Sequence, residues 1–235
     1  MTDIYTKKSM ETWNAIACSF DLTRKKPWKE CIEFINSIPI KSVVADIGCG
    51  NGRHLIPCAK RCKKVIGLDV SDELLKIVNK KINDKKLDNV SLIHSDAVNI
   101  PLKKNSINQV LYIATLHNIS KRYRRIKSLK EINRILTPEG YAFVSVWSRW
   151  QDKFRQHFMR NYRNIPEKKE FGDTNIYWKQ HGLNVSRYYH LYSMRELRQD
   201  LISAGFKIEK LEGVKFFSKS YYDNYFALIK KEIKK

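Results

Sequence analysis

The chain has 235 residues, of which 43% are apolar, and it carries a formal net charge of +21. A chain of this length can bury a single hydrophobic core, so we expect one domain over residues 1–235. No apolar run approaches the roughly 20 residues of a membrane-spanning helix. The polar N-terminal segment does not resemble a secretory signal, so composition argues against a membrane protein and favours the cytoplasm.

The five cysteines are odd in number and show no paired spacings. Both features argue against a disulfide framework. Cys58 and Cys62 have a spacing that puts them on one helix face, but two thiolates without a nearby pair of histidines make a poor zinc site. We therefore expect reduced, mostly structural cysteines and no metal ion.

The positive charge favours a polyanionic partner, because each neutralised phosphate releases counterions. Eleven of the fourteen arginines lie between Arg122 and Arg198. This clustering favours a phosphate-facing surface and hence a nucleic-acid substrate. The alternative is a lysine-rich surface that is merely solvated.

Regular elements begin after a helical extension that we assign to residues 1–40. Ser42–Ile47 is a short apolar strand of the kind found in a parallel sheet covered on both faces. Val65–Asp69 is the second strand. Ser71 is expected to cap the following helix, whose apolar residues recur at helical spacing over Leu74–Val78.

The middle of the chain continues this alternation. Val90–His94 and Gln109–Ala114 are the third and fourth strands, and Tyr123–Leu136 is a helix that residues 138–140 are expected to break. Tyr141–Trp147 is the fifth strand. Strands that alternate with helices imply right-handed crossovers and a parallel sheet.

Residues 148–190 interrupt the pattern, because they are basic and aromatic and show no clear period. We treat them as an insertion at the carboxyl edge of the sheet. Ser193–Glu196 is a capping box that opens a further helix, and Phe206–Leu211 and Tyr225–Ile229 are the last two strands. The fold class is α/β, a doubly wound, mostly parallel seven-stranded sheet.

A glycine-rich turn over Asp46–Gly52 follows the first strand, with glycines at positions 48, 50 and 52. Ligands of open α/β sheets bind at this edge, and glycines let them approach the backbone. A dinucleotide fingerprint would need a glycine where this chain has Arg53. Asp69 and Asp96 follow the next two strands, where carboxylates can accept hydrogen bonds from a ribose and from an adenine amino group.

These features resemble the class I methyltransferases, whose signature is Asp-x-Gly-x-Gly-x-Gly. The resemblance covers residues 40–147 and implies that the cofactor is S-adenosylmethionine. It further implies that the cofactor is bound by Asp46, Gly48, Gly50, Asn51, Gly52, Asp69, Val70, Asp96, Ala97 and Ala114.

Three flanking motifs narrow the resemblance. They are Trp13–Trp28, Ala114–Ser120 and Arg187–Tyr192. In this order they are similar to motifs of the tRNA wobble-uridine carboxymethyl methyltransferases, the family shared by a yeast enzyme and the methyltransferase part of its AlkB-like animal relative. That family esterifies 5-carboxymethyluridine in the tRNA anticodon loop. The resemblance puts the helical extension, residues 1–40, on the substrate side.

The chemistry of that reaction directs the choice of catalytic candidates. A carboxylate, with a free pKa near ~4, is already ionised at neutral pH and needs no strong base. The enzyme must instead orient it, and an arginine fork suits that task. We expect Arg24 and Arg187 to hold the carboxylate, with His117 and Tyr188 as donors at the rim. Arg24 could instead be a surface arginine, and Tyr188 or Tyr189 could belong to the core.

The resemblance also implies partners. Family members work with a small zinc-binding activator protein that pairs with the third strand, here Val90–His94, to form a heterodimer. Two alternatives stay open. One is a methyltransferase of a small quinone or lipid precursor, and the other is a non-catalytic RNA-binding subunit with the same fold.

Overall fold

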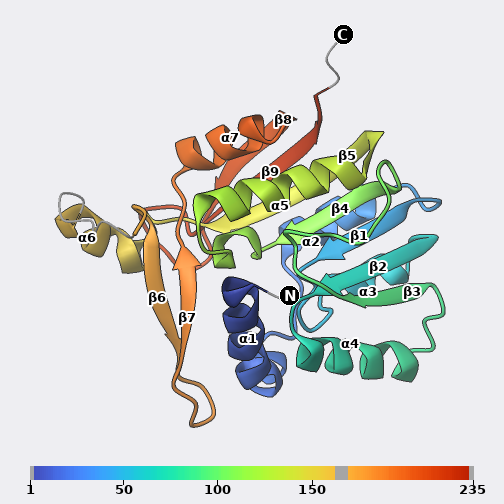
Figure 1. Cartoon of the computed structure of the whole chain (residues 1–235), viewed down its shortest axis with the longest axis horizontal. Coiled ribbons are helices and arrows are strands. Elements are labelled where there is room, and N and C mark those ends of the chain that lie inside the picture. The colour runs from blue at the N-terminus through green and yellow to red at the C-terminus, as the bar shows by residue number, and fades with distance from the viewer. Residues whose placement is uncertain (1–2, 162–168, 233–235) are drawn as a thin grey trace.

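A seven-stranded β-sheet forms the centre of the protein (Figure 1). The computed structural model describes residues 3–161 and 169–232. The strands of this sheet are β1 (Val43–Ile47), β2 (Lys64–Asp69), β3 (Val90–His94), β4 (Ile107–Ile113), β5 (Leu136–Trp147), β8 (Phe206–Val214) and β9 (Asn224–Lys231).

The strand order is β3-β2-β1-β4-β5-β9-β8. The first five strands are parallel, and β9 runs antiparallel to both β5 and β8. The chain moves outward from β1 to β3 and then returns to β4 on the other side of β1. This reversal makes β1 and β4 the switch point of a doubly wound sheet, where a ligand is expected. The predicted fold class is confirmed.

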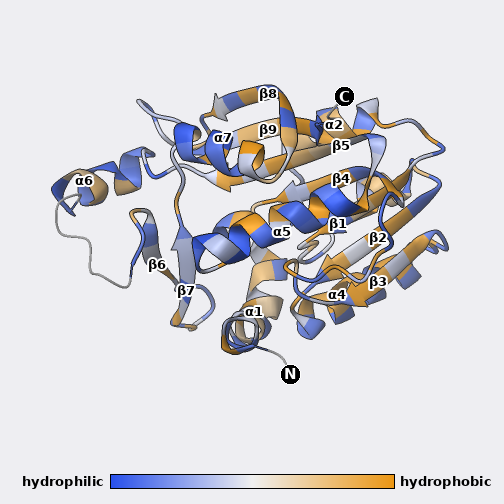
Figure 2. Ribbon diagram, turned by 45° about the horizontal axis from the view of Figure 1, so that its top comes forward, coloured by the Kyte–Doolittle hydropathy of each residue, from blue (hydrophilic) through white to orange (hydrophobic). Residues whose placement is uncertain are grey.

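Helices cover both faces of the sheet. The core on one face includes residues from α5 and α7, and the core on the other face includes residues from α2, α3 and α4. Figure 2 shows the hydrophobic residues concentrated in the strands between these layers. No helix in the described part of the chain is long and apolar enough to cross a membrane. The helices are α1 (Ile4–Thr23), α2 (Lys29–Ser37), α3 (Leu55–Ala59), α4 (Asp72–Asp84), α5 (Arg122–Ile135), α6 (Asp152–Asn161) and α7 (Met194–Ser203), with a 3₁₀ turn η1 (Leu116–Asn118).

The expected serine caps are present, although the Glu196 carboxylate of the predicted capping box pairs with Arg149 and His190 instead. Ser71 Oγ accepts a hydrogen bond from the Leu74 N–H at the start of α4. Ser193 Oγ accepts one from the Glu196 N–H at the start of α7. Each cap satisfies a backbone donor that has no partner within its helix.

The boundary between α5 and β5 differs from the prediction. The helix ends at Ile135, and β5 begins at once with Leu136 and runs through Pro138. Helical backbone is disfavoured before a proline, which explains why Thr137 is already extended. The pairing of β5 with β4 is irregular at this point, and a Cβ on Gly140 would lie 2.8 Å from the Asn108 carbonyl oxygen. The proline and glycine therefore mark an irregular strand start and not a loop.

Residues 148–190, which were treated as an insertion without a clear period, include regular elements that were not predicted. They contain α6 and an antiparallel hairpin of β6 (Asp173–Trp178) and β7 (Val185–His190), while residues 162–168 lie outside the described part of the chain. The hairpin was missed because the buried positions of β7 are Arg187, Tyr189 and His190. Aliphatic residues, which make a strand pattern easy to recognise, are absent from them.

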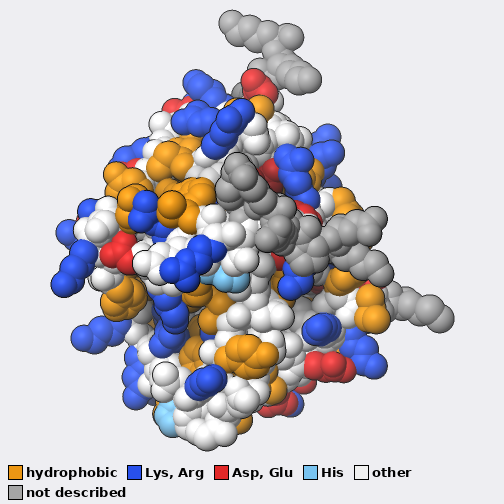
Figure 3. Space-filling view, turned by 90° about the vertical axis from the view of Figure 1, so that its left-hand side faces the viewer, with side chains coloured by type: hydrophobic (Ala, Val, Ile, Leu, Met, Phe, Trp, Pro, Cys, Tyr) orange, Lys and Arg blue, Asp and Glu red, His pale blue; other side chains and the backbone are white. Residues whose placement is uncertain are grey.

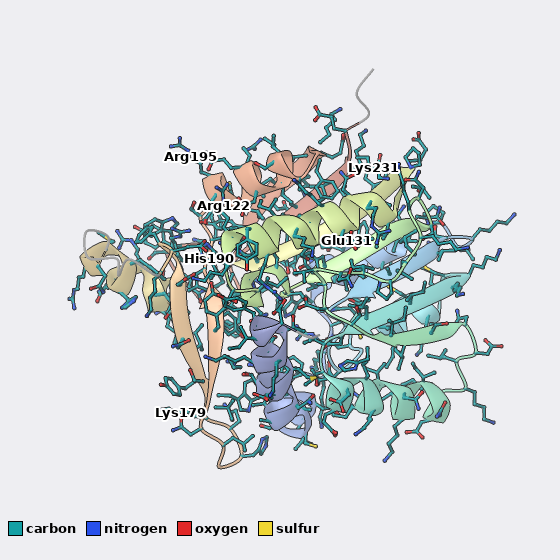
Figure 4. The ribbon with its side chains drawn as sticks, viewed as in Figure 1. Arg122, Glu131, Lys179, His190, Arg195 and Lys231 are labelled. Atoms are coloured by element: carbon teal, nitrogen blue, oxygen red, sulfur yellow. The ribbon has the colours of Figure 1, made fainter. Side chains whose placement is uncertain are left out.

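The hairpin is anchored at both ends. Near its tip, Trp178 Nε1 donates a hydrogen bond to Ser19 Oγ of α1 over 2.7 Å. At its base, His190 is hydrogen-bonded to Asp173 and to Glu196 of α7, each within 2.8 Å. Figure 4 shows His190 near the ends of α5 and α7. The hairpin and α1 therefore form a wall beyond the carboxyl ends of the parallel strands.

Candidate active site

The glycine turn after β1 has a backbone that suits glycine. Gly48, Gly50 and Gly52 have φ angles of 72°, 54° and 78°, in the left-handed region. A Cβ on Gly48 would lie 2.2 Å from Thr115 Oγ1, which follows β4. Gly48 therefore packs against Thr115 so closely that no side chain would fit between them, and this contact joins the ends of β1 and β4.

Asp69, at the end of β2, is fixed in the same turn. Its Oδ2 accepts a hydrogen bond from the Gly50 N–H over 2.8 Å, and its Oδ1 accepts one from the Ser71 N–H over 2.9 Å. Burial raises the pKa of this carboxyl group, while these hydrogen bonds oppose the rise. Each oxygen keeps a further lone pair, so the carboxylate can accept two hydroxyl groups of a bound ribose.

A cavity opens between this turn, α1 and the hairpin. Most of the predicted cofactor residues share its wall. They are Gly48, Gly50, Asn51, Asp69, Val70, Asp96, Ala97 and Ala114.

Two predicted cofactor residues, Asp46 and Gly52, are not on this wall. Asp46 is buried, and its Oδ2 has no hydrogen-bond partner among the described residues. Burial, with the nearby charge of Asp69, raises the pKa of Asp46 to about 7. Gly52 packs against Val78 of α4. Both residues shape the turn from behind.

The resemblance puts residues 1–40 on the substrate side, but Arg24 was the residue predicted from this segment, and four residues of α1 that line the cavity were not. Tyr5, Ser9, Trp13 and Phe20 all line it. The first three are spaced by four residues, which puts them on one face of a helix. This aromatic stripe was the signal that could have identified the cover of the site.

Asp96, at the end of β3, joins α1 to the cavity through an ion-pair network. Arg124 Nη2 donates to Asp96 Oδ2 over 2.9 Å, and Thr6 Oγ1 donates to the same oxygen. Arg124 also pairs with Asp3. The network leaves Asp96 on the cavity wall, with Oδ1 accepting the Val98 N–H, and holds the start of α1 over it.

His117 lies deeper in the cavity, in η1 after β4. Its Nδ1 accepts a hydrogen bond from the Trp147 N–H over 3.0 Å, so the ring proton is on Nε2. Burial, reinforced by the Arg187 charge, lowers the pKa of His117 to about 3. The ring stacks on Tyr189 with 5.1 Å between centroids. His117 is therefore a neutral hydrogen-bond donor at physiological pH.

Arg187, on β7, is a buried cation surrounded by aromatic rings. Its guanidinium carbon lies 4.9 Å from the Trp178 ring and 5.8 Å from the Trp13 ring. Its Nη1 donates to Tyr189 Oη over 2.7 Å, and its Nε has no hydrogen-bond partner in the described chain. Among the residues that the structure describes, no carboxylate pairs with it. The site therefore presents a positive charge that is suited to an anionic ligand.

Arg24 approaches the same place from the end of α1. Its guanidinium lies 5.2 Å from the Trp178 ring, so Trp178 contacts both arginines. Arg24 is exposed but also lines the cavity. The two predicted carboxylate-binding arginines thus come together, although they are far apart in the sequence.

Tyr188, predicted as a donor at the rim of the site, does not line the cavity, whereas Tyr189 does. Adjacent strand residues point to opposite faces, so Tyr189 shares the face of Arg187. Tyr188 points away and donates a hydrogen bond to Asp173 over 2.6 Å. Burial raises the pKa of Tyr188, and Asp173 reinforces the rise. Its role is to stabilise the hairpin.

The arginine cluster is also less exposed than predicted. Arg124, Arg125, Arg149 and Arg187 are buried, and Arg163 lies outside the described residues. Much of the cluster therefore holds the hairpin and α1 to the sheet. Figure 3 still shows more lysine and arginine than acidic side chains on the end of the molecule that carries α6 and the hairpin.

Comparison with known proteins agrees with this geometry. A family model described as a methyltransferase domain matches residues 45–144. A methyltransferase from Methanosarcina mazei has the same fold, with a TM-score of 0.73, 18% identity, and coverage of 89% of this chain and 100% of its own. A chain of the complex between the Haloferax volcanii Trm112 methyltransferase activator and a putative methyltransferase gives a TM-score of 0.69 at 14% identity, covering 97% of this chain and 99% of its own. Sheet order, glycine turn and acidic strand ends define a class I, S-adenosylmethionine-dependent methyltransferase.

Curated relatives share sequence as well as fold. A putative methyltransferase of Encephalitozoon cuniculi is 31% identical over 192 residues, which are 80% of this chain and 82% of the relative. The tRNA (carboxymethyluridine(34)-5-O)-methyltransferase of Schizosaccharomyces pombe is 28% identical over 208 residues, covering 83% and 86%. This chain belongs to the methyltransferase family that contains these proteins. The Macaca fascicularis relative ALKBH8 is 32% identical over 170 residues, 71% of this chain, and the chain spans 24% of that longer protein.

Proposed function

We propose that the chain transfers the methyl group of S-adenosylmethionine to the carboxylate of 5-carboxymethyluridine at the wobble position of tRNA. The observation that carries this proposal is Arg187, a buried cation beside the cofactor cavity with no carboxylate partner in the described chain. The names of the tRNA-modifying relatives support the choice of base. A tRNA substrate makes the cytoplasm the expected compartment.

The residues around the glycine turn fit the cofactor. Gly48 lines the cavity and lets the turn pack against Thr115 without a clash, and the fixed Asp69 carboxylate suits a ribose. Asp96 and Ala97 line the part of the cavity beyond β3, where we expect the adenine. When bound, S-adenosylmethionine supplies an electrophilic methyl group on a sulfonium.

The remaining residues orient the nucleophile. Arg24 and Arg187 hold the substrate carboxylate, and His117 Nε2–H and the Tyr189 hydroxyl are the neutral donors beside it. A carboxylate held by these residues would be the nucleophile of a single displacement, with the neutral thioether of the cofactor as the leaving group. No proton is transferred, so no general base is required. Proximity and orientation can supply about 7–11 kcal/mol of such a barrier.

The test is methyl transfer from labelled S-adenosylmethionine to tRNA from cells that lack the wobble methyl ester. We expect an alkali-labile ester on carboxymethyluridine. Arg24→Ala should abolish transfer while cofactor binding, measured by calorimetry, survives. An unchanged rate in the variant would refute the role of Arg24. Transfer to a small molecule without tRNA would favour the quinone or lipid alternative, and failure to bind cofactor would favour a non-catalytic RNA-binding subunit.

We further propose that a small zinc-binding activator pairs with β3. This strand is at the edge of the sheet, and its residues Val90, Leu92 and Ile93 are only partly buried. An edge strand presents unpaired backbone groups to a partner. The fold of this chain also resembles a structure solved with the Trm112 activator. Co-expression with such a protein should raise yield and activity, and a stable, fully active lone chain would contradict the dependence.

A further inference from the structure

The loop between β8 and β9 exposes aromatic side chains to an unusual degree. Phe217 is 95% exposed, Tyr222 46% and Tyr221 39%. A single exposed apolar residue is ordinary, but three exposed aromatic rings within six residues of one loop are unusual. We call residues 215–222 the aromatic loop.

Two aspartates fix the backbone of the aromatic loop. Asp223 Oδ2 accepts hydrogen bonds from the backbone N–H groups of Phe216, Phe217 and Ser218 over 2.7–2.9 Å. Asp152, at the start of α6, accepts hydrogen bonds from the next three backbone N–H groups, of residues 219–221. Phe217 is therefore exposed on an ordered backbone, and a ligand that binds it loses little loop entropy.

The charge of the aromatic loop is positive. Lys215 and Lys219 belong to it, it contains no acidic residue, and the two aspartates beside it are engaged with its backbone. The guanidinium of Arg155, on α6, lies 4.4 Å from the Tyr221 ring. Figure 3 shows hydrophobic side chains beside lysines and arginines on the end of the molecule that carries α6. Rings interleaved with cations fit an anionic ligand that has flat faces.

The aromatic loop is continuous with the active-site cavity. Phe216 turns inward and packs against Trp28, with 5.3 Å between ring centroids. Trp28 lines the cavity and lies under the guanidinium of Arg53 at 4.8 Å. Phe217, the next residue after Phe216, does not line the cavity and is exposed to solvent beside this contact.

We propose that Phe217 is a stacking platform for a base of single-stranded RNA that flanks the nucleotide in the active site, while Lys215, Lys219 and Arg155 contact its phosphates. This inference rests on the proposed function, because an RNA loop must bring one nucleotide into the cavity. Proteins hold unpaired bases by stacking them on aromatic rings, and every base offers a flat face for this contact. The inference assigns the RNA-binding surface that the buried arginine cluster does not supply.

The test measures the affinity of the full chain for a fluorescent anticodon stem-loop by anisotropy. Phe217→Ala should weaken binding about 5- to 100-fold, the effect expected for loss of one stacked base. Phe217→Trp should retain the affinity. Ile40→Ala is the matched control. Ile40 is 66% exposed and precedes β1, so it lies at the amino ends of the parallel strands and away from the aromatic loop. Its loss should leave the affinity unchanged.

Two further measurements separate this inference from the proposed function. Cofactor affinity and methyl transfer to the free 5-carboxymethyluridine nucleoside should be the same in Phe217→Ala and the parent chain. RNA affinity that depends on Phe217 in a chain without transfer activity would uphold the platform and overturn the proposed function. Normal transfer activity with RNA affinity unaffected by Phe217→Ala would overturn the platform alone.

Discussion

At the scale of single residues, the active site is organised around the cost of burying Arg187. A buried charge without a counter-ion is unfavourable, and burial accordingly lowers the pKa of this guanidinium. The rings of Trp13, Trp178 and Tyr189 recover part of that energy through cation–π contacts. A substrate carboxylate would complete the interaction with an ion pair. The free protein thus holds its carboxylate receptor in place before the substrate arrives.

Arg187→Lys tests this receptor. Lysine keeps the positive charge but has no planar fork, so the carboxylate is held by one contact and turns away from the methyl donor. We expect kcat/KM for tRNA methylation to fall about 10- to 100-fold, from the loss of about 1.5–3 kcal/mol of charged hydrogen bonding. Cofactor affinity should not change. Arg198→Ala is the control, because Arg198 is an exposed residue of α7. A parental kcat/KM in Arg187→Lys would show that Arg187 does not hold the substrate carboxylate.

The lowered pKa of His117 predicts how the free energy of unfolding depends on pH. Its pKa is lowered from 6.5 to about 3, so between these values the unfolded chain binds a proton that the folded chain does not. The free energy of unfolding therefore decreases as pH falls below 6.5, by at most about 1.4 kcal/mol per unit from this group. Urea unfolding at pH 7 and pH 5 should show a smaller decrease in His117→Gln than in the parent chain. Equal decreases would mean that His117 titrates normally.

At the scale of elements, the strands with an apolar pattern could be predicted from the sequence. The hairpin, whose buried side chains are polar or aromatic, could not. The parallel strands were recognisable because both faces are buried, as in the run Val43–Ile47. Asp69 was correctly placed at a strand end. The hairpin was not predicted, because buried positions of β7 hold Arg187 and Tyr189 and not aliphatic residues. The sequence also did not specify which of Tyr188 and Tyr189 faces the cavity, because the register of such a strand is set by its neighbours.

The contact between the hairpin and α1 predicts the effect of Ser19→Ala. Ser19 Oγ accepts the Trp178 indole N–H and is hydrogen-bonded to His181 Nδ1, each over 2.7 Å. The variant leaves a buried indole donor unpaired, which costs about 1–3 kcal/mol. Urea unfolding should reveal this loss. Ser37→Ala removes only an exposed hydrogen bond to the Phe34 carbonyl and should cost much less. Equal stability of both variants would show that the contact does not hold the hairpin.

At the scale of the whole molecule, three separate parts of the chain enclose one cavity. They are α1, the switch point of the sheet and strand β7 of the hairpin. The N-terminal segment is tied to β3 and α5 by Arg124, and the hairpin is tied to α7 by His190. Both covers therefore depend on distant elements. The cavity is formed only when the complete fold is formed.

The net charge of +21 leads to a prediction about salt. Each contact between an RNA phosphate and a cationic side chain adds about −0.7 to −0.9 to the slope of log affinity plotted against log salt concentration. With about four such contacts, tRNA affinity should fall about 50- to 150-fold between ~50 and ~200 mM salt. Methylation of the free nucleoside lacks these contacts and should change little over the same range. This comparison separates the charge that binds RNA from the charge that is only solvated. A flat salt dependence for tRNA would assign the excess lysines to solvated surface and favour a small-molecule substrate.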